Sequence, residues 1–269
     1  MSRGRADPTV RILPGACSDA GGVGRAVVLS PAMAAWDGGA FFGPLINTLR
    51  GCGLDVVLVD SLSLAGPNPC CIDQLAQCAA RWLDDSGPVD VLVGNALGGA
   101  LAQLLLPTTR PKAAVLLSAP TRVDHELERR LRWVVAAAER GGAEEAHAAL
   151  MQLVRRRGEE PGTVAPPSRN DARGVDDSGT RLAQLRLLYG LDTSAAFQAY
   201  DGPVLQVVGE HSRLVGPQHL VEGANSVQLV VPDAGMRPHL DAPDIVSGAV
   251  ASFVTQEVVR DAIGSRAAR

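Results

Sequence analysis

Hydrophobic residues gather in short runs along this chain, and glycine, proline or polar residues separate the runs. Six continuous apolar runs predict buried strands, at residues 25–30, 54–60, 89–93, 113–118, 203–208 and 226–231. A shorter run predicts a first strand at residues 9–13. Amphipathic stretches between the runs predict helices, of which the clearest are 41–50, 72–82 and 245–258. Because the runs are continuously apolar, they predict an α/β protein with a mostly parallel sheet of about eight strands and helices on both faces.

The pattern changes after residue 121. Residues 123–140 and 144–157 are charged and rich in alanine, which predicts two helices with no strand between them. A polar stretch at 158–179 predicts a loop, and helical patterns resume at 180–189 and 193–200. This interruption predicts a core made of residues 1–120 and 201–269, with a helical lid, residues 121–200, inserted into it.

Composition narrows the possible classes of protein. Of the 269 residues, 46% are hydrophobic and only 3% are aromatic, so a large core must be built mainly from alanine, valine and leucine. The net charge of −4 gives no reason to expect a nucleic-acid partner. No apolar run approaches the ~20 residues that a membrane span needs. We therefore expect a small-molecule substrate or ligand, without nucleic acid or membrane as partner.

The cysteines and glycines indicate whether the protein holds a metal or a cofactor and in which cellular compartment it lies. An odd number of cysteines, five, in a chain of this size predicts reduced thiols and a cytoplasmic protein. Cys70 and Cys71 are adjacent, and no Cys-x-x-Cys pair occurs, so we expect no metal site. The glycines at Gly21, Gly22 and Gly24 are not followed by Lys-Ser or Lys-Thr, so they predict no phosphate-binding loop. We expect no cofactor.

The most informative stretch is residues 91–102, which reads as a buried strand, a glycine-flanked turn and a helix that begins with small residues. Gly94 and Gly98 have the spacing of the nucleophile elbow, Gly-x-Ser-x-Gly, in which strand and helix pass too closely for side chains. The central residue here is Ala96, which has no oxygen with which to attack a substrate. The stretch predicts the architecture of an elbow without its nucleophile.

Two further stretches complete a family pattern. Residues 207–215, Val-Val-Gly-Glu-His-Ser-Arg-Leu-Val, resemble the acid loop Gly-Glu-x-Asp-x-Leu-Val. Residues 235–243, Gly-Met-Arg-Pro-His-Leu-Asp-Ala-Pro, resemble the histidine loop Gly-His-x-Pro-x-x-Glu-x-Pro. With the elbow, they make residues 25–258 resemble the α/β-hydrolase superfamily, in its small, lidded esterase-like and lyase-like branch. The resemblance implies the α/β-hydrolase fold.

The resemblance also assigns site positions. It places the nucleophile at Ala96, the acid at Ser212 and the base at Met236, so that all three positions of the catalytic triad are substituted. The family's oxyanion hole uses backbone N–H groups, which here would belong to Met33 and Leu97. An anion-stabilising site therefore does not depend on the missing side chains.

Other residues are candidates for a pocket or for relocated catalytic groups, each with an ordinary structural alternative. Trp36, Met236 and Tyr200 either line a pocket or pack in the core. Asn95, His211 and His239 either enter the site or support it from outside. Asp124 with His125 forms either a relocated dyad or the start of a helix. We expect Asp60 to brace neighbouring loops, and His147 and His219 to be solvated.

These observations leave three functions open. The first is a cofactor-free, non-hydrolytic enzyme, namely a cyclase, lyase or C–C bond-forming catalyst, that acts on a small carbonyl-bearing molecule in bacterial specialised metabolism. The second is a catalytically inactive ligand-binding or sensor protein. The third is a hydrolase with relocated groups, in which His239 or His125 activates water. The sequence favours the first function, and it names neither the substrate nor the oligomeric state.

Overall fold

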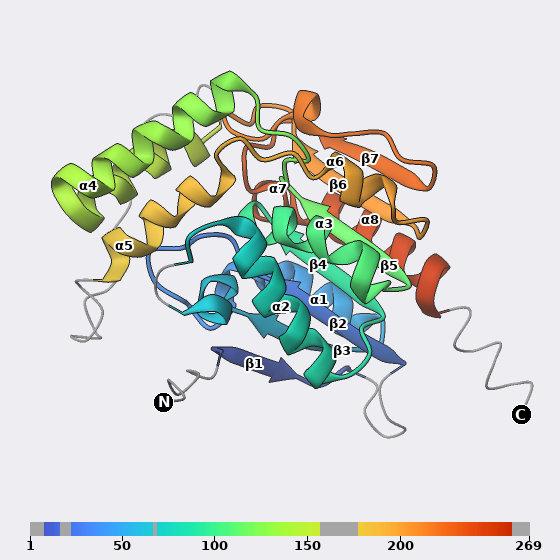
Figure 1. The fold of residues 1–269 in the computed structure, drawn as a ribbon. Helices are drawn as coiled ribbons and strands as arrows, with labels where there is room; N and C mark the ends of the chain where they lie inside the picture. The colour runs from blue at the N-terminus through green and yellow to red at the C-terminus, as the bar shows by residue number, and fades with distance from the viewer. Residues whose placement is uncertain (1–7, 17–22, 67–68, 157–176, 260–269) are drawn as a thin grey trace, which may run out of the picture.

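The computed structural model describes residues 8–16, 23–66, 69–156 and 177–259, and Gly21, Gly22 and Cys17 lie outside this part of the chain. Its strands form one seven-stranded sheet in the order β1-β3-β2-β4-β5-β6-β7 (Figure 1). The strands are β1 (Val10–Leu13), β2 (Gly24–Leu29), β3 (Leu54–Val59), β4 (Val91–Asn95), β5 (Ala113–Leu117), β6 (Val204–Gly209) and β7 (Ser226–Val231). β1 pairs with β3 in the antiparallel sense, and all other neighbours are parallel. The predicted mostly parallel sheet of about eight strands is confirmed.

Helices cover both faces of the sheet (Figure 1). Because successive side chains of a strand point to opposite faces, Val27 and Leu29 join one core cluster, and Ala26 and Val28 join the other. The first cluster includes residues of α2 (Ile72–Ser86) and α3 (Leu97–Thr109), and the second includes residues of α1 (Gly43–Gly51) and α8 (Pro243–Val254). Apolar residues of the central strands therefore pack on both faces, which is why these strands read as continuous hydrophobic runs.

Between β5 and β6 the chain forms α4 (His125–Val154), α5 (Asp177–Ala183), η4 (Gln184–Leu188) and α6 (Ser194–Gln198). α4 is broken at Gly142, whose φ of 73° and ψ of −153° are not helical, so it consists of the two helices that the sequence predicts. α4 and α5 pack side by side beyond one edge of the sheet (Figure 1). Thr193 N–H donates to the carbonyl of Thr121 at 2.8 Å, which ties the two ends of this segment together.

The short elements are η2 (Ala40–Phe42), η3 (Ser61–Ala65), η5 (Pro217–His219), α7 (Pro238–Asp241) and η6 (Thr255–Val259). In the described part of the chain, no helix combines the length and the apolarity that crossing a membrane requires. The cysteines there are free thiols, namely Cys52, Cys70, Cys71 and Cys78. Since β2, β4, β5, β6 and β7 run parallel, the loops after these strands meet at one edge of the sheet.

Candidate active site

The turn between β4 and α3 has the geometry of a nucleophile elbow. Its central residue, Ala96, has φ 49° and ψ −113°, a conformation that costs a non-glycine residue about 1–3 kcal/mol. A Cβ atom on Gly98 would lie 2.3 Å from the carbonyl oxygen of Leu29. A Cβ atom on Gly94 would lie 2.4 Å from the carbonyl oxygen of Gly98. The glycines are therefore required for β4, α3 and β2 to approach one another.

The two candidate oxyanion donors belong to the segments that follow the neighbouring strands β2 and β4. Leu97 is the first residue of α3, so its N–H has no acceptor within the helix. Met33 follows β2, which pairs with β4 up to Leu29 opposite Gly94. The positive end of the α3 dipole favours negative charge beside the elbow. The side chain of Ala96 adds neither a donor nor a nucleophile.

A buried ion pair holds the loop after β2. Arg181 of α5 donates from Nη2 to Asp60 Oδ1 at 2.8 Å and to Oδ2 at 3.0 Å. The same side chain donates from Nε to the carbonyl of Met33 at 3.1 Å. The side chains of Arg181 and Asp60 are only 16% and 3% exposed. Asp60 therefore braces neighbouring loops, as expected. Its partner, Arg181, could not be predicted, because the sequence around Arg181 shows only a polar stretch.

The structure brings the acid and base positions into contact. Ser212 follows β6 and Met236 follows β7, and the serine hydroxyl donates to Met236 Sδ at 3.6 Å. A Cβ atom on Gly209 would lie 2.1 Å from the carbonyl oxygen of Gly235, so the two loops touch along their backbones as well. Met236 is 6% exposed, and thioether sulfur is a weak acceptor. A partly buried, weakly polar contact thus joins the two residues that the sequence pattern assigns to the acid and base positions.

The remaining pocket candidates are spread more widely. Asn95 is buried, and its Nδ2 donates to the carbonyl of Leu117 at 3.1 Å, which ties β4 to β5. Trp36 is half-buried against the core cluster on the α1 and α8 face. Tyr200 donates its hydroxyl proton to the carbonyl of Pro111 at 2.8 Å, and burial raises its pKa to about 12. Because Pro111 precedes β5, Tyr200 lies toward the opposite edge of the sheet from Ala96 and is not brought to the elbow.

His239, on α7, is buried between aromatic rings. Its Nε2 lies 3.2 Å from the carbonyl oxygen of Phe41, and its ring meets Phe41 edge to face at 4.7 Å and stacks on Phe42 at 5.8 Å. Burial lowers the pKa of His239 to about 4, so the ring is neutral at neutral pH. Its Nδ1 is buried and has no hydrogen-bond partner among the described residues.

His219 is buried, 3% exposed, so the expectation that it is solvated is wrong. Gly216 N–H donates to its Nδ1 at 3.0 Å, and its Nε2 lies 3.3 Å from Asp124 Oδ2. Asp124 also caps α4 by accepting from Leu127 N–H at 2.7 Å, and this bond, with His219 nearby, lowers the pKa of Asp124. Nδ1 accepts a hydrogen bond, and Nε2 lies near the Asp124 carboxylate without forming one, so His219 packs the start of α4 against the loop after β6.

The other three histidines differ in exposure. His125, the first residue of α4, is exposed, and Asp124 faces His219 instead of it. His147, expected to be solvated, is half-buried. His211 is partly exposed, with Nε2 3.6 Å from Asp233 Oδ1 and 4.0 Å from Glu210 Oε2. One ligand atom from each of His211, Asp233 and Glu210 lies within 4.8 Å of the others, a spacing at which a metal could bind, although exposed acidic groups are often this close without one.

This geometry agrees with the comparisons with known proteins. The chain belongs to the alpha/beta hydrolase family, whose model matches residues 15–249. Among solved structures it is similar to a thermophilic esterase from Thermogutta terrifontis, with 18% identity, 93% of this chain and 94% of that chain covered, and a TM-score of 0.65. An enol-lactonase from Burkholderia xenovorans shows 16% identity, coverage of 92% and 96%, and a TM-score of 0.71.

A bromoperoxidase from Bacillus anthracis shows 14% identity, coverage of 93% of this chain and 97% of that chain, and a TM-score of 0.63. No curated protein matches the chain in sequence. Identities this low show a shared fold, and the activity of this chain has to be argued from its own residues.

Proposed function

We propose that this protein is a cofactor-free, non-hydrolytic member of its family, a cyclase, lyase or C–C bond-forming enzyme that acts on a small carbonyl-bearing molecule. The observation that carries the proposal is the elbow itself. Ala96 retains the strained conformation of a nucleophile elbow, and Leu97 N–H has no acceptor within α3, but residue 96 supplies no nucleophile. Strain of this kind persists where the surrounding structure enforces it, often at functional sites.

The substitutions remove acyl-enzyme chemistry as a unit. That chemistry needs an oxygen or sulfur nucleophile, an imidazole to take its proton and a carboxylate to orient the imidazole. Ala96, Met236 and Ser212 supply a methyl group, a thioether and a hydroxyl group, and none of these takes up a proton at neutral pH. The backbone N–H groups of Met33 and Leu97 can still stabilise an enolate or alkoxide, because oxyanion stabilisation needs only oriented donors.

The helices after β5 complete the proposed site. We take residues 121–200 as a lid over a core of residues 1–120 and 201–269. Arg181 supports this division, because its hydrogen bond to the Met33 carbonyl links α5 to the loop that carries a proposed oxyanion donor. A lid that closes over the elbow excludes water, which favours chemistry other than hydrolysis.

The decisive test compares three proteins in their reaction with a fluorophosphonate and with p-nitrophenyl acetate. We expect the wild type and Ala96→Ser to be unlabelled and nearly inert, because triad members act as a unit. The triple variant Ala96→Ser, Ser212→Asp, Met236→His restores the family's pattern and is expected to gain labelling at residue 96. Wild-type esterase activity that the fluorophosphonate blocks would overturn the proposal.

A second experiment tests the ligand. We expect some members of a panel of small enolisable ketones and β-keto esters to raise the melting temperature of the wild type and to be converted without hydrolysis. Ala96→Phe fills the site and should abolish both effects, whereas Ala148→Phe, at an exposed position of α4, should abolish neither. Binding without any product would favour the sensor function instead. An Ala96→Phe protein that folds and retains activity would place the function elsewhere.

A hydrolase with relocated groups is the second candidate. The unpaired, buried Nδ1 of His239 favours it, because an imidazole nitrogen that is not hydrogen-bonded can accept a proton from a water molecule that reaches it. Ester hydrolysis by the wild type that is lost in His239→Gln and insensitive to fluorophosphonate would support this candidate over the first. His125→Gln serves as the control, since His125 is exposed at the start of α4.

A further inference from the structure

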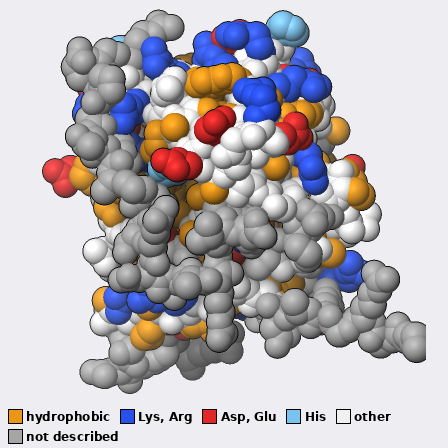
Figure 2. Space-filling view, turned by 90° about the vertical axis from the view of Figure 1, so that its left-hand side faces the viewer, with side chains coloured by type: hydrophobic (Ala, Val, Ile, Leu, Met, Phe, Trp, Pro, Cys, Tyr) orange, Lys and Arg blue, Asp and Glu red, His pale blue; other side chains and the backbone are white. Residues whose placement is uncertain are grey.

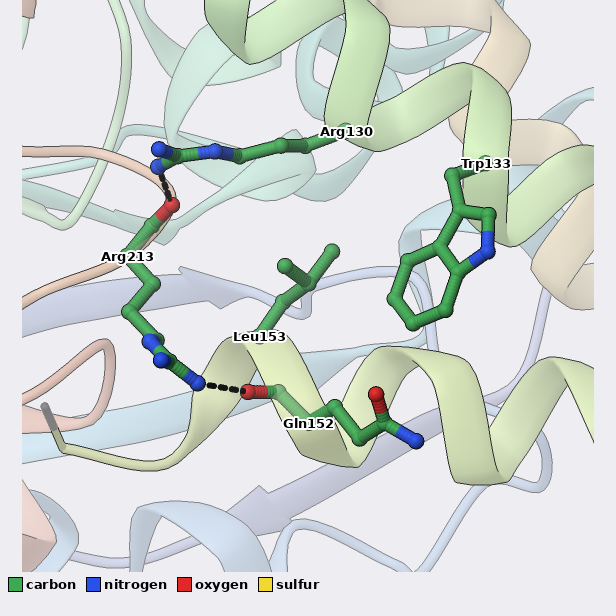
Figure 3. Close-up of a pocket in the computed structure, with 5 residues that line it drawn as sticks. All are labelled: Arg130, Trp133, Gln152, Leu153 and Arg213. Carbon is green, nitrogen blue, oxygen red and sulfur yellow. Dashed lines mark hydrogen bonds between the residues drawn. The ribbon is translucent and has the colours of Figure 1, made fainter. Parts of the chain in front are cut away.

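A hollow lies between the two halves of α4 and the loop after β6 (Figure 3). Its volume is about 280 Å³, just below the range of about 300–1,000 Å³ that is typical of ligand pockets. It is lined by Arg130, Trp133, Gln152, Leu153 and Arg213. None of Ala96, Ser212 and Met236 lines it, although Arg213 directly follows Ser212 in the loop after β6.

The charge in this hollow comes mainly from Arg213. Its Nη1 donates to the carbonyl of Gln152 at 3.1 Å, and within the described residues no carboxylate forms an ion pair with it. Arg130 differs, because its Nη2 lies 2.7 Å from Glu126 Oε1 and its Nη1 donates to the carbonyl of Arg213. Figure 2 shows Lys and Arg side chains gathered near the top of this end of the molecule. Arg213 is therefore a cation that the described part of the chain does not neutralise.

The opposite side of the hollow is apolar. The indole of Trp133 lies across the hollow from the Arg213 guanidinium, with the side chain of Leu153 between them (Figure 3). Trp133 is 41% exposed, which is unusual for so large an apolar side chain in a chain with 3% aromatic residues. The hollow is thus cationic on one side and apolar on the other.

We propose that this hollow binds a small amphipathic anion, a carboxylate carried on one aromatic ring or a short apolar chain. The planar guanidinium of Arg213 matches a carboxylate, for which it forms paired, charge-assisted hydrogen bonds. The apolar body of the ligand packs on Trp133 and Leu153, where it covers exposed apolar surface. The ligand would also fasten the loop after β6 to α4, because Gln152 and Arg213 come from these two elements.

The test uses benzoate as probe and ligand-observed NMR titration as readout. We expect the wild type to bind benzoate with a dissociation constant on the order of 1 mM, and benzamide and acetate at least tenfold more weakly, since each lacks one of the two recognised features. Arg213→Gln and Trp133→Ala should each weaken benzoate binding at least tenfold. Arg129→Gln is the matched control, because Arg129 lies on the same helix and pairs with Glu126 but does not line the hollow.

Two further variants make each outcome decisive. Arg213→Lys retains the charge and loses the planar fork, so we expect intermediate affinity, and melting temperatures confirm that all variants are folded. Ala96→Phe should bind benzoate like the wild type, since the elbow is a different site. The proposal is overturned by a wild type that does not bind benzoate, by unchanged binding in Arg213→Gln, by equal binding of benzamide, or by loss of binding in Ala96→Phe.

Discussion

The turn at Ala96 and the pair of loops that carry Ser212 and Met236 lie at the same edge of the sheet, yet different contacts hold them. The turn is fixed by close backbone approaches at Gly94 and Gly98, and a buried ion pair holds the neighbouring loop after β2. The two loops meet through a hydroxyl-to-thioether contact of 3.6 Å. The backbone of the turn is therefore held by steric contacts that do not involve the side chain of residue 96, whereas the contact between the loops depends on the side chains of Ser212 and Met236.

Breaking the ion pair beside the elbow should have the largest effect. Asp60→Asn leaves the charge of Arg181 buried without its partner, which should lower the free energy of unfolding by about 3–4 kcal/mol. Denaturant unfolding measures the loss. Arg122→Gln is the control, because its pair with Asp192 is exposed, 65% and 47%, and should contribute less than about 1 kcal/mol. Equal losses in the two variants would contradict a special role for the buried pair.

Crowding the elbow should have the next largest effect. Gly98→Ala places a Cβ atom 2.3 Å from the carbonyl oxygen of Leu29, so the strand and helix must separate, at a cost of about 2–3 kcal/mol. Gly248→Ala is the matched control, because a Cβ atom there meets no atom within 4 Å and the residue lies inside α8. That control should gain about 0.8 kcal/mol from helix propensity. A Gly98→Ala protein as stable as wild type would show that the elbow is not tightly packed.

The free energy of unfolding should depend on pH through His239, which lies on α7 after the loop that carries Met236. Its folded-state pKa of about 4 lies below the unfolded value of about 6.5, so the unfolded state binds more protons between these values. Stability due to this residue is therefore lost as the pH falls through this window, by about 2 kcal/mol between about pH 7 and about pH 4.5. The unfolding free energy of His239→Gln should fall less steeply than that of the wild type, whereas His125→Gln should follow the wild type. Parallel curves for wild type and His239→Gln would refute the prediction.

Removing the contact between the loops should have the smallest effect. Ser212→Ala deletes one weak hydrogen bond to Met236 Sδ and should change the free energy of unfolding by less than about 1 kcal/mol. Met236→Ala is the comparison, because it deletes a buried side chain and should cost about 2 kcal/mol or more. A loss for Ser212→Ala as large as that for Met236→Ala would mean that the hydroxyl holds the two loops together after all.

Much of the fold could be predicted because its signals are local. The central strands are buried on both faces, so their apolar runs are continuous and easy to read. The elbow could be predicted because only glycine fits where strand and helix touch, as at Gly94 and Gly98. The break in α4 fell at Gly142, between the two predicted helices, for a similar reason: its φ of 73° favours glycine.

The site side chains could be predicted only in part. His219 was expected to be a solvated helix residue, but its ring is buried between Asp124 and Gly216. Tyr200 is apolar enough for a pocket, but its hydroxyl is held by Pro111, toward the other edge of the sheet. In both cases the deciding partner comes from another element, so no local pattern announces it.

By itself, the sequence determined the parallel sheet, the elbow turn and the absence of a nucleophile at residue 96, since each follows from the residues in a short stretch. Tertiary structure alone decided that Arg181 reaches Asp60 across 121 positions, that Ser212 meets Met236, and that Arg213 and Trp133 face one hollow. The physical reason is that apolar periodicity and steric limits act between near neighbours, whereas a polar side chain finds its partner only after the chain has folded.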